Sequence, residues 1–270
     1  MELIDSHAHI DAEQFAEDRD AVLARAQAAG VATLLAIGTG PGPAKLDAAL
    51  PYAENHDWIF TTVGIHPHDA KEVTQRHLEM LATLARHRKV IAWGEIGLDY
   101  YYDHSPRDIQ ERVFRDQMSL AHQAKLPIII HCRDAWDDCL RVLEDAWKPT
   151  GLGGILHCFG STLDHAKRGM DMGFLISFAG NCTYPKAQNI RDVAKGLSLA
   201  NILIETDSPY LAPQPYRGKR NEPSYIGEVA KVLANVRNST QEEIAAATAA
   251  NFRHFFHLAQ SSGSPAGLSR

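Results

Sequence analysis

Histidines and acids occur at several points in the sequence, each directly after a short apolar run. The first are His7 and His9, which follow the apolar residues that begin at Leu3. If residues 3–10 form a β-strand, its side-chain period of two places Asp5, His7 and His9 on one face. Imidazoles placed in this way can bind a metal ion, although an isolated His-x-His pair is equally compatible with surface histidines beside a turn. Partners elsewhere in the chain must therefore decide between the two interpretations.

Further polar residues follow later apolar runs in the same way. They are His66, Glu95, His131, His157, Glu205 and Asp207. A single histidine at the edge of a core has a ready structural explanation, because it can bond a loop carbonyl. The same pattern after five runs is harder to explain without metal, since clustered imidazoles and acids would otherwise repel one another and titrate together. The pattern therefore predicts a metal site.

The residue types and their number predict the composition of that site. The expected ligands are His7, His9, Glu95, His131, His157 and Asp207. One catalytic zinc ion uses three protein ligands and a water, so six ligands indicate two divalent ions, with Glu95 as the bridge between the two histidine groups. A pair of ions activates water and polarises a phosphoryl or carbonyl oxygen, which is the chemistry of a hydrolase. The nitrogen and oxygen ligands accept Mg²⁺, Mn²⁺ or Zn²⁺ and do not choose among them.

The elements that must position these residues alternate regularly. Eight short β-branched or apolar runs begin at residues 2, 31, 59, 90, 127, 153, 174 and 202, and helical periodicity fills most of the intervals between them. Parallel strands need crossover connections, and eight such units suit an α/β fold of the closed (β/α)₈ TIM-barrel type. The C-terminal ends of its strands would bring the polar residues to one mouth. An open doubly wound sheet is the best alternative, but no Gly-rich phosphate turn follows the first run.

Helical patterns continue after the eighth run. One spans residues 226–236, and another begins with the capping-box pattern Thr240 to Glu243. We expect these extra C-terminal helices to cover the outside of the barrel. The sequence thus predicts a single metallohydrolase domain over residues 1–260 and a flexible polar tail over residues 261–270.

Composition limits the classes of protein that need consideration. The chain has 270 residues, a net charge of −6 and 45% hydrophobic residues, which suits one globular α/β domain. This acidic balance opposes a broad basic surface for duplex nucleic acid but leaves room for a local phosphate pocket. The start lacks a secretory signal, no run of about 18 apolar residues occurs, and four cysteines without CxxC spacing indicate free thiols. We expect a cytoplasmic protein without membrane contact, and the sequence indicates no obligate protein partner.

Seven segments together resemble the TatD family of metal-dependent hydrolases, within the amidohydrolase superfamily. They are DSHAHI, VGIHPHDA, GEIGLDYYYD, IIIHCRDA, LHCFGS, ETDSPYL and RGKRNEP, spread over residues 5–223. The resemblance implies that the six expected ligands bind divalent metals and that the protein hydrolyses phosphodiester bonds in DNA, often with Mg²⁺ or Mn²⁺. Many enzymes of the superfamily bridge their metals with a carboxylated lysine from the fourth strand, whereas this chain has Glu95 there.

Residues near the expected mouth favour a phosphodiester substrate. Arg133 shares a strand face with His131, where a guanidinium suits a phosphate through bidentate bonds unless Asp134 or Asp137 pairs with it. We expect His66 to bind substrate with Arg133. Asp207 and Glu95 are the expected catalytic residues, and Asp207 is expected to take a proton from the attacking water.

Two more groups leave alternatives open. The basic loop Arg217, Lys219 and Arg220 suits a flanking phosphate but is equally compatible with a solvated charge run. Residues 100–102 are three tyrosines that either stack a base or pack a loop. A recessed mouth on a mildly acidic protein favours a single strand or strand end over the middle of a duplex.

The sequence therefore predicts a divalent-metal-dependent deoxyribonuclease, an exonuclease on single strands or strand ends. The first alternative is a metal-dependent amide or ester hydrolase, such as a deacylase, because the same metal pair activates a carbonyl. A metal-stabilised binding protein without turnover is a further alternative.

Overall fold

The computed structural model describes residues 1–259 and contains eight parallel β-strands in one sheet, paired in chain order from β1 to β8. The strands are β1 (Leu3–Ala8), β2 (Val31–Ala36), β3 (Ile59–Val63), β4 (Val90–Asp99), β5 (Ile128–Arg133), β6 (Gly154–Leu156), β7 (Phe174–Phe178) and β8 (Ile202–Ile204). A parallel bridge between Ala8 and Ser208 joins the end of β1 to the segment after β8. The TIM-barrel prediction is confirmed, and the strands match the eight expected runs.

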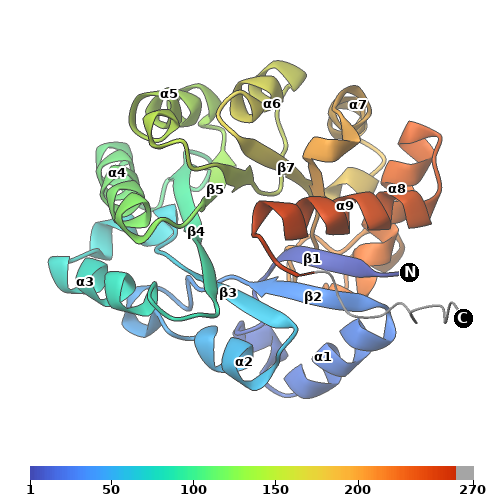
Figure 1. Cartoon of the computed structure of the whole chain (residues 1–270), viewed down its shortest axis with the longest axis horizontal. Helices are drawn as coiled ribbons and strands as arrows, with labels where there is room; N and C mark the ends of the chain where they lie inside the picture. Colours follow the sequence, from blue (N-terminus) through green and yellow to red (C-terminus); the bar gives the residue numbers. More distant parts are fainter. Residues whose placement is uncertain (260–270) are drawn as a thin grey trace, which may run out of the picture.

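Helices surround the strands (Figure 1). They are α1 (Arg19–Ala28), α2 (Leu50–Asn55), α3 (Gln75–Leu84), α4 (Arg107–Ala124), α5 (Trp136–Ala146), α6 (Leu163–Met170), α7 (Gln188–Gly196) and α8 (Ile226–Arg237). A buried apolar layer between sheet and helices includes Phe114 of α4, Leu140 of α5 and Phe174 of β7. Burial of this layer holds each strand in place, which fixes where the strand ends point.

The last helix, α9 (Gln241–Phe255), differs from the prediction. Its capping box is formed as expected, because Thr240 and Glu243 exchange side-chain bonds with each other's backbone N–H. However, Ala249 and Phe252 pack in one cluster with interior residues at the starts of the strands, such as Ile4 and Ile129. The helix thus closes the N-terminal end of the barrel (Figure 1, in front of the strands) and does not cover its outside. The inward-facing side chains at the starts of the strands form an apolar surface at this end of the barrel, and α9 buries that surface.

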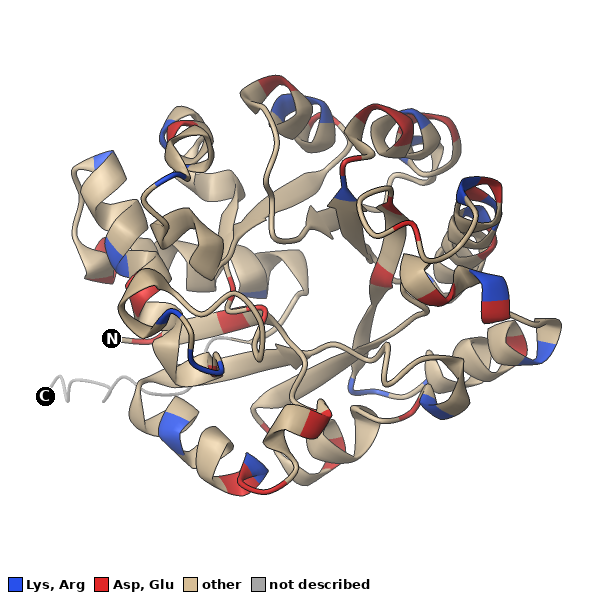
Figure 2. Ribbon diagram, turned by 180° about the vertical axis from the view of Figure 1, so that it is seen from behind, with Lys and Arg blue, Asp and Glu red and all other residues tan. Residues whose placement is uncertain are grey.

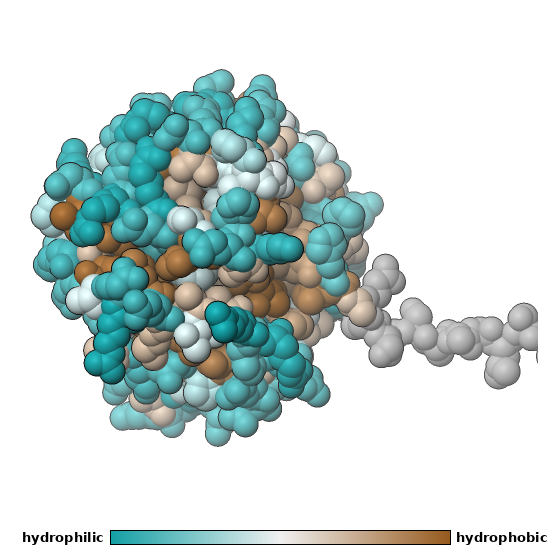
Figure 3. Space-filling model, turned by 60° about the vertical axis from the view of Figure 1, so that its left-hand side comes forward, coloured by the Kyte–Doolittle hydropathy of each residue, from teal (hydrophilic) through white to brown (hydrophobic). Residues whose placement is uncertain are grey.

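The surface follows the usual division between water and core. Charged residues of both signs occur mainly on the surrounding helices, and few occur on the strands (Figure 2). The side of the molecule in Figure 3 is mainly hydrophilic, with hydrophobic residues visible in smaller patches. Among the described residues, no helix is long and apolar enough to span a bilayer. The predicted tail over residues 261–270 lies outside the described residues.

Candidate metal centre

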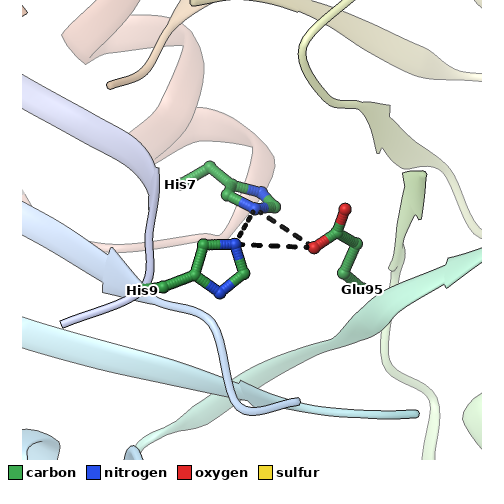
Figure 4. Close-up of side chains that lie close together, drawn as sticks. All are labelled: His7, His9 and Glu95. Atoms are coloured by element: carbon green, nitrogen blue, oxygen red, sulfur yellow. Dashed lines mark hydrogen bonds and ion pairs between the residues drawn. The ribbon is translucent and has the colours of Figure 1, made fainter. Parts of the chain in front are cut away.

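Four side chains converge at the C-terminal mouth of the barrel, two from the end of β1, one from β4 and one from the segment after β8. The Nε2 atom of His7 lies 3.3 Å from Nε2 of His9, 3.4 Å from Oε2 of Glu95 and 3.6 Å from Oδ1 of Asp207. The corresponding distances from Nε2 of His9 are 3.7 Å to Glu95 and 3.5 Å to Asp207. Figure 4 shows His7 and His9 pointing toward one oxygen of Glu95. We call these four residues the first ligand group.

The backbone at the end of β1 explains how His7, His9 and Asp207 come together at the mouth of the barrel. Strand β1 ends at Ala8, and its register with β2 shifts between Asp5 and Ala8. Ser6 bonds Ser177 of β7 across the interior of the barrel, and the next residue, His7, also points into the mouth. The strict alternation of faces expected from the sequence therefore does not hold here. Instead, backbone bonds from Asp207 to the His7 carbonyl (2.9 Å) and from His9 to the Ser208 carbonyl (2.7 Å) align the two segments. These bonds place Asp207 beside the His-x-His pair.

The other carboxylate oxygen of Glu95 faces a second ligand group. Its Oε1 atom lies 2.8 Å from Nδ1 of His131 and 2.6 Å from Nε2 of His157, and these two nitrogens are 3.5 Å apart. His131 belongs to β5, and His157 directly follows β6. We call Glu95, His131 and His157 the second ligand group. The structure thus brings all six expected ligands together, with Glu95 between the two groups.

The donor atoms of the first ligand group fit a cation. An ion about 2.1 Å from each of four tetrahedral ligands separates those ligands by roughly 3.4 Å. The separations from 3.3 to 3.7 Å between the donors of His7, His9, Glu95 and Asp207 match this value. Imidazole and carboxylate donors also suit the common divalent metals.

Carboxylates behind the histidines fix which ring nitrogen is available. In His131, Nε2 donates to Asp99 over 3.0 Å, so Nδ1, which faces Glu95, is the nitrogen left for a cation once its proton is lost. In His157, Nδ1 donates to Glu205 over 3.2 Å, so Nε2 is the nitrogen left for a cation once its proton is lost. Such carboxylate–histidine pairs hold metal-binding imidazoles in the required tautomer and orientation. Glu205, directly after β8, therefore lies where it orients the His157 ring.

His66 differs from these two histidines because its ring proton lies on the nitrogen that faces Glu95. Its Nδ1 accepts the backbone N–H of His68 over 3.2 Å, so the ring proton resides on Nε2, which lies 3.6 Å from Oε1 of Glu95. Burial, followed by the nearby charge of His131, lowers the pKa of His66 to about 3, so the ring is neutral. A protonated Nε2 cannot bind a metal but can donate a hydrogen bond. This geometry is compatible with the substrate-binding role that was expected for His66.

Asp99, at the end of β4, was missed from the sequence. Its Oδ2 accepts bonds from His131 and, over 2.9 Å, from Nε2 of His68, while its Oδ1 accepts the backbone N–H groups of Tyr101 and Tyr102. Burial opposes its charge, yet these bonds hold the pKa of Asp99 below its usual range. Asp99 thus links the second ligand group to residues 100–102, which we call the tyrosine loop. The signal was present, because Asp99 stands four residues after Glu95 and shares its face in a period of two.

Charges within the two groups are balanced by protons. Burial favours the neutral acid, but His157, His66 and His7 outweigh it and hold the pKa of Glu95 well below its usual value. Conversely, burial opposes charge on His157, but Glu95 and Glu205 raise its pKa well above the ordinary value. The pKa of His131 is raised in the same way by Asp99 and Glu95. Cations bound here would take over the role of these protons.

The two ligand groups border a cavity of about 910 Å³, which is lined in part by His9, Glu95, His131, His157 and Asp207. Arg133 stands at its rim, where its guanidinium lies 4.0 Å from the ring centre of Tyr101 and 4.9 Å from that of Tyr102. In the described part of the chain, neither Asp134 nor Asp137 forms an ion pair with Arg133. The guanidinium is therefore exposed in the pocket without a counter-charge, and it is free to bind an anion.

The other basic and aromatic candidates have separate surroundings. Arg220 forms an ion pair with Asp18 at 2.7 Å, so it is not available to a phosphate. Arg217 instead stacks on Tyr184. Tyr100 is partly buried and its hydroxyl donates to Asp138, so this residue packs the loop and does not stack a base. Tyr101 and Tyr102 are exposed.

Comparison with known proteins defines the class of this barrel. Residues 4–257 match the family model described as TatD related DNase. The chain is 41% identical over 256 residues to an uncharacterized metal-dependent hydrolase, YabD, of Bacillus subtilis, with 95% of this chain and 99% of that protein covered. It is 35% identical over 261 residues to the 3'-5' ssDNA/RNA exonuclease TatD of Salmonella typhimurium, with 95% and 99% covered. The crystal structure of YjjV, a TatD homologue of Escherichia coli K12, superposes with a TM-score of 0.89 at 32% identity and covers 95% of this chain and 98% of that one.

The barrel with its polar mouth is thus of the hydrolase class, and the chain belongs to the TatD related DNase family. The resemblance drawn from the seven sequence segments is confirmed.

Proposed function

We propose that this protein is a divalent-metal-dependent nuclease that cleaves phosphodiester bonds at the ends of single DNA strands. The observation that carries the proposal is the position of Glu95, whose two carboxylate oxygens each face a separate group of ligands. The naming of a relative as a 3'-5' ssDNA/RNA exonuclease supports the choice of substrate. An unpaired arginine at the rim of the same cavity supports a phosphate as the group that is bound.

Two cations are proposed for the site. His7, His9, Asp207 and Oε2 of Glu95 would hold one, and His131, His157 and Oε1 of Glu95 would hold the other. When bound, divalent ions supply acidity to a water molecule and neutralise charge on phosphoryl oxygens. Mg²⁺, Mn²⁺ and Zn²⁺ all remain in the proposal, because the mixed nitrogen and oxygen donors accept each of them.

The chain's own residues supply the proton transfer and the positioning. Burial opposes ionisation of Asp207, but its bond with His9 and the nearby histidines lower its pKa, so the carboxylate is ionised and can accept a proton from the attacking water. His66, through its Nε2–H group, and Arg133, through its guanidinium, both line the cavity and are proposed to donate to phosphate oxygens. Asp99 and Glu205 hold the histidines behind the reacting groups.

The alternative of amide or ester hydrolysis is not favoured. The family that the chain matches is a nuclease family. In addition, Arg133 and His66, the two residues proposed to donate hydrogen bonds to the substrate, suit a charged tetrahedral phosphate better than a neutral carbonyl. The four cysteines are free thiols in the structure, which supports the proposal of a reducing, cytoplasmic location.

A substrate panel tests the proposed function. The purified chain, stripped of metal and then supplied with Mg²⁺, Mn²⁺ or Zn²⁺, is incubated with end-labelled single-stranded DNA, duplex DNA, bis-p-nitrophenyl phosphate and p-nitrophenyl acetate. We expect metal-dependent release of nucleotides from the end of the single strand and slower cleavage of the blunt duplex. Metal-dependent hydrolysis of the acetate with no cleavage of single-stranded DNA, duplex DNA or bis-p-nitrophenyl phosphate would overturn the proposal in favour of carbonyl chemistry.

A further inference from the structure

A smaller pocket adjoins the cavity above the metal centre. It has a volume of about 500 Å³ and is formed by the segment from Asn181 to Ile190 together with Arg217. Asn181 and Ile190 line both the small pocket and the large cavity, so the two spaces are neighbours. A chain molecule bound at the metal centre can therefore extend into the small pocket.

The lining of the small pocket combines an aromatic ring with positive charge. The guanidinium of Arg217 lies 4.3 Å from the centre of the Tyr184 ring. Lys186 and Arg217 are both exposed, and none of the described residues that line this pocket is acidic. Neither cation forms an ion pair with any residue of the described chain, in contrast to Arg220, which pairs with Asp18. The pocket is thus a positively charged aromatic surface without a built-in counter-ion.

Hydrogen bonds hold this surface in position. The Arg191 guanidinium donates to three carbonyls of the loop, those of Cys182, Tyr184 and Pro185. The Tyr184 hydroxyl donates to the Ala212 carbonyl over 3.0 Å, which ties the loop to the segment that carries Arg217. A ring fixed in this way loses little conformational freedom when a ligand packs against it.

We propose that the small pocket is a subsite for a nucleotide next to the scissile phosphate. The aromatic ring of Tyr184 and the plane of Arg217 provide a stacking surface for a base, and Arg217 with Lys186 binds the adjoining phosphate. Stacking and contacts with a phosphate are both tolerant of sequence, so the subsite recognises a single strand as such and not a particular base. This inference rests on the proposed function, because the nucleotide in the small pocket belongs to the same DNA strand whose phosphate is cleaved at the metal centre.

Kinetics with substrates of different length test the subsite. The holoenzyme is assayed with bis-p-nitrophenyl phosphate, which has a single phosphate and no neighbouring nucleotide, and with single-stranded hexathymidylate. We expect Arg217→Gln and Tyr184→Ala to reduce kcat/KM for hexathymidylate about tenfold more than kcat/KM for the short ester. Tyr184→Phe, which keeps the ring, should retain most of the activity on hexathymidylate. Arg88→Gln removes an exposed charge at the opposite end of the barrel and serves as the matched control.

A second readout is independent of turnover. Fluorescence anisotropy of labelled hexathymidylate with the full chain in EDTA gives the dissociation constant as a function of salt. Loss of one phosphate contact in Arg217→Gln should make the slope of log Kd against log salt shallower by about 0.7, and Arg88→Gln should not change it. If the wild type cleaves hexathymidylate and the Arg217 and Tyr184 variants match it in both assays, the subsite is wrong and the proposed nuclease stands. If the wild type cleaves no oligonucleotide, the nuclease proposal itself fails.

Discussion

His131 donates from Nε2 to a carboxylate oxygen of Asp99 over 3.0 Å, and its other ring nitrogen faces Glu95 over 2.8 Å. Asp99 therefore decides which nitrogen of His131 is available to a cation. It also binds His68 and the backbone of the tyrosine loop, so a single buried carboxylate links the second ligand group to the rim that carries Arg133.

Asp99→Asn should weaken metal binding without unfolding the protein. The amide keeps the shape of the carboxylate but removes the charge that orients His131, and loss of such a partner typically costs about 10- to 100-fold in metal affinity. Titration calorimetry with Mn²⁺ measures the effect. Asp137→Asn, which changes an exposed carboxylate on α5, is the control, and equal affinities in the two variants would show that Asp99 does not orient the metal site.

Asp207→Asn should lower kcat for bis-p-nitrophenyl phosphate by about 10²- to 10⁴-fold, because the amide cannot accept a proton from water. Thermal unfolding should still be cooperative, since the side chain retains its size. Asp192→Asn, an exposed carboxylate on α7, is expected to behave as the wild type. A kcat within a few-fold of the wild type in Asp207→Asn would rule out this residue as the base.

Metal affinity should rise with pH near neutrality. Burial opposes charge on His9, His131 and His157, but neighbouring carboxylates raise the pKa of each, so these rings retain protons at pH values where an ordinary histidine is neutral. A cation must displace those protons, and each one costs up to about tenfold in affinity per pH unit below the pKa. His7 and His66 have lowered pKa values and do not add to this dependence.

Calorimetry in buffers of different ionisation enthalpy measures that effect as proton release on Mn²⁺ binding. We expect release of protons at pH 7 and a weaker affinity at pH 6. Binding that releases no protons and is constant over this range would contradict the charge balance described for the site.

Phe252→Ala should destabilise the barrel. The side chain is fully buried where α9 closes the N-terminal end, and such truncations typically cost about 3–5 kcal/mol of the free energy of unfolding. Urea denaturation measures the loss, and His254→Ala, an exposed change on the same helix, should stay within about 0.5 kcal/mol. Metal affinity should not change in the folded variant. A loss as small as that of His254→Ala would mean that α9 is not a closing element.

The fold could be predicted because local pattern and topology agree. The run that begins at Pro127 is apolar and ends in His131, and the strand observed is Ile128–Arg133. Closure of parallel strands into a barrel then requires all strand ends to face one mouth, so residues as distant as His7 and Asp207 become neighbours. This geometric rule allowed the six residues to be chosen without contact information.

The remaining features depend on tertiary packing that a pattern does not encode. The apolar residues of α9 indicate that the helix is buried, but not which surface it covers. The tautomer of His66 depends on the backbone turn that presents the N–H of His68. The shift of register in β1 lets the consecutive residues Ser6 and His7 both point into the barrel, which an alternating strand does not allow. Asp99 differs from these, because its spacing from Glu95 was a usable signal.

Anomalous scattering from a crystal loaded with Mn²⁺ tests the central claim most directly. The account predicts two peaks about 3.5–4 Å apart on either side of the Glu95 carboxylate, one in contact with His7, His9 and Asp207 and the other with His131 and His157. A crystal with full Mn²⁺ present that shows no peak, or a single peak that does not touch Glu95, would contradict it.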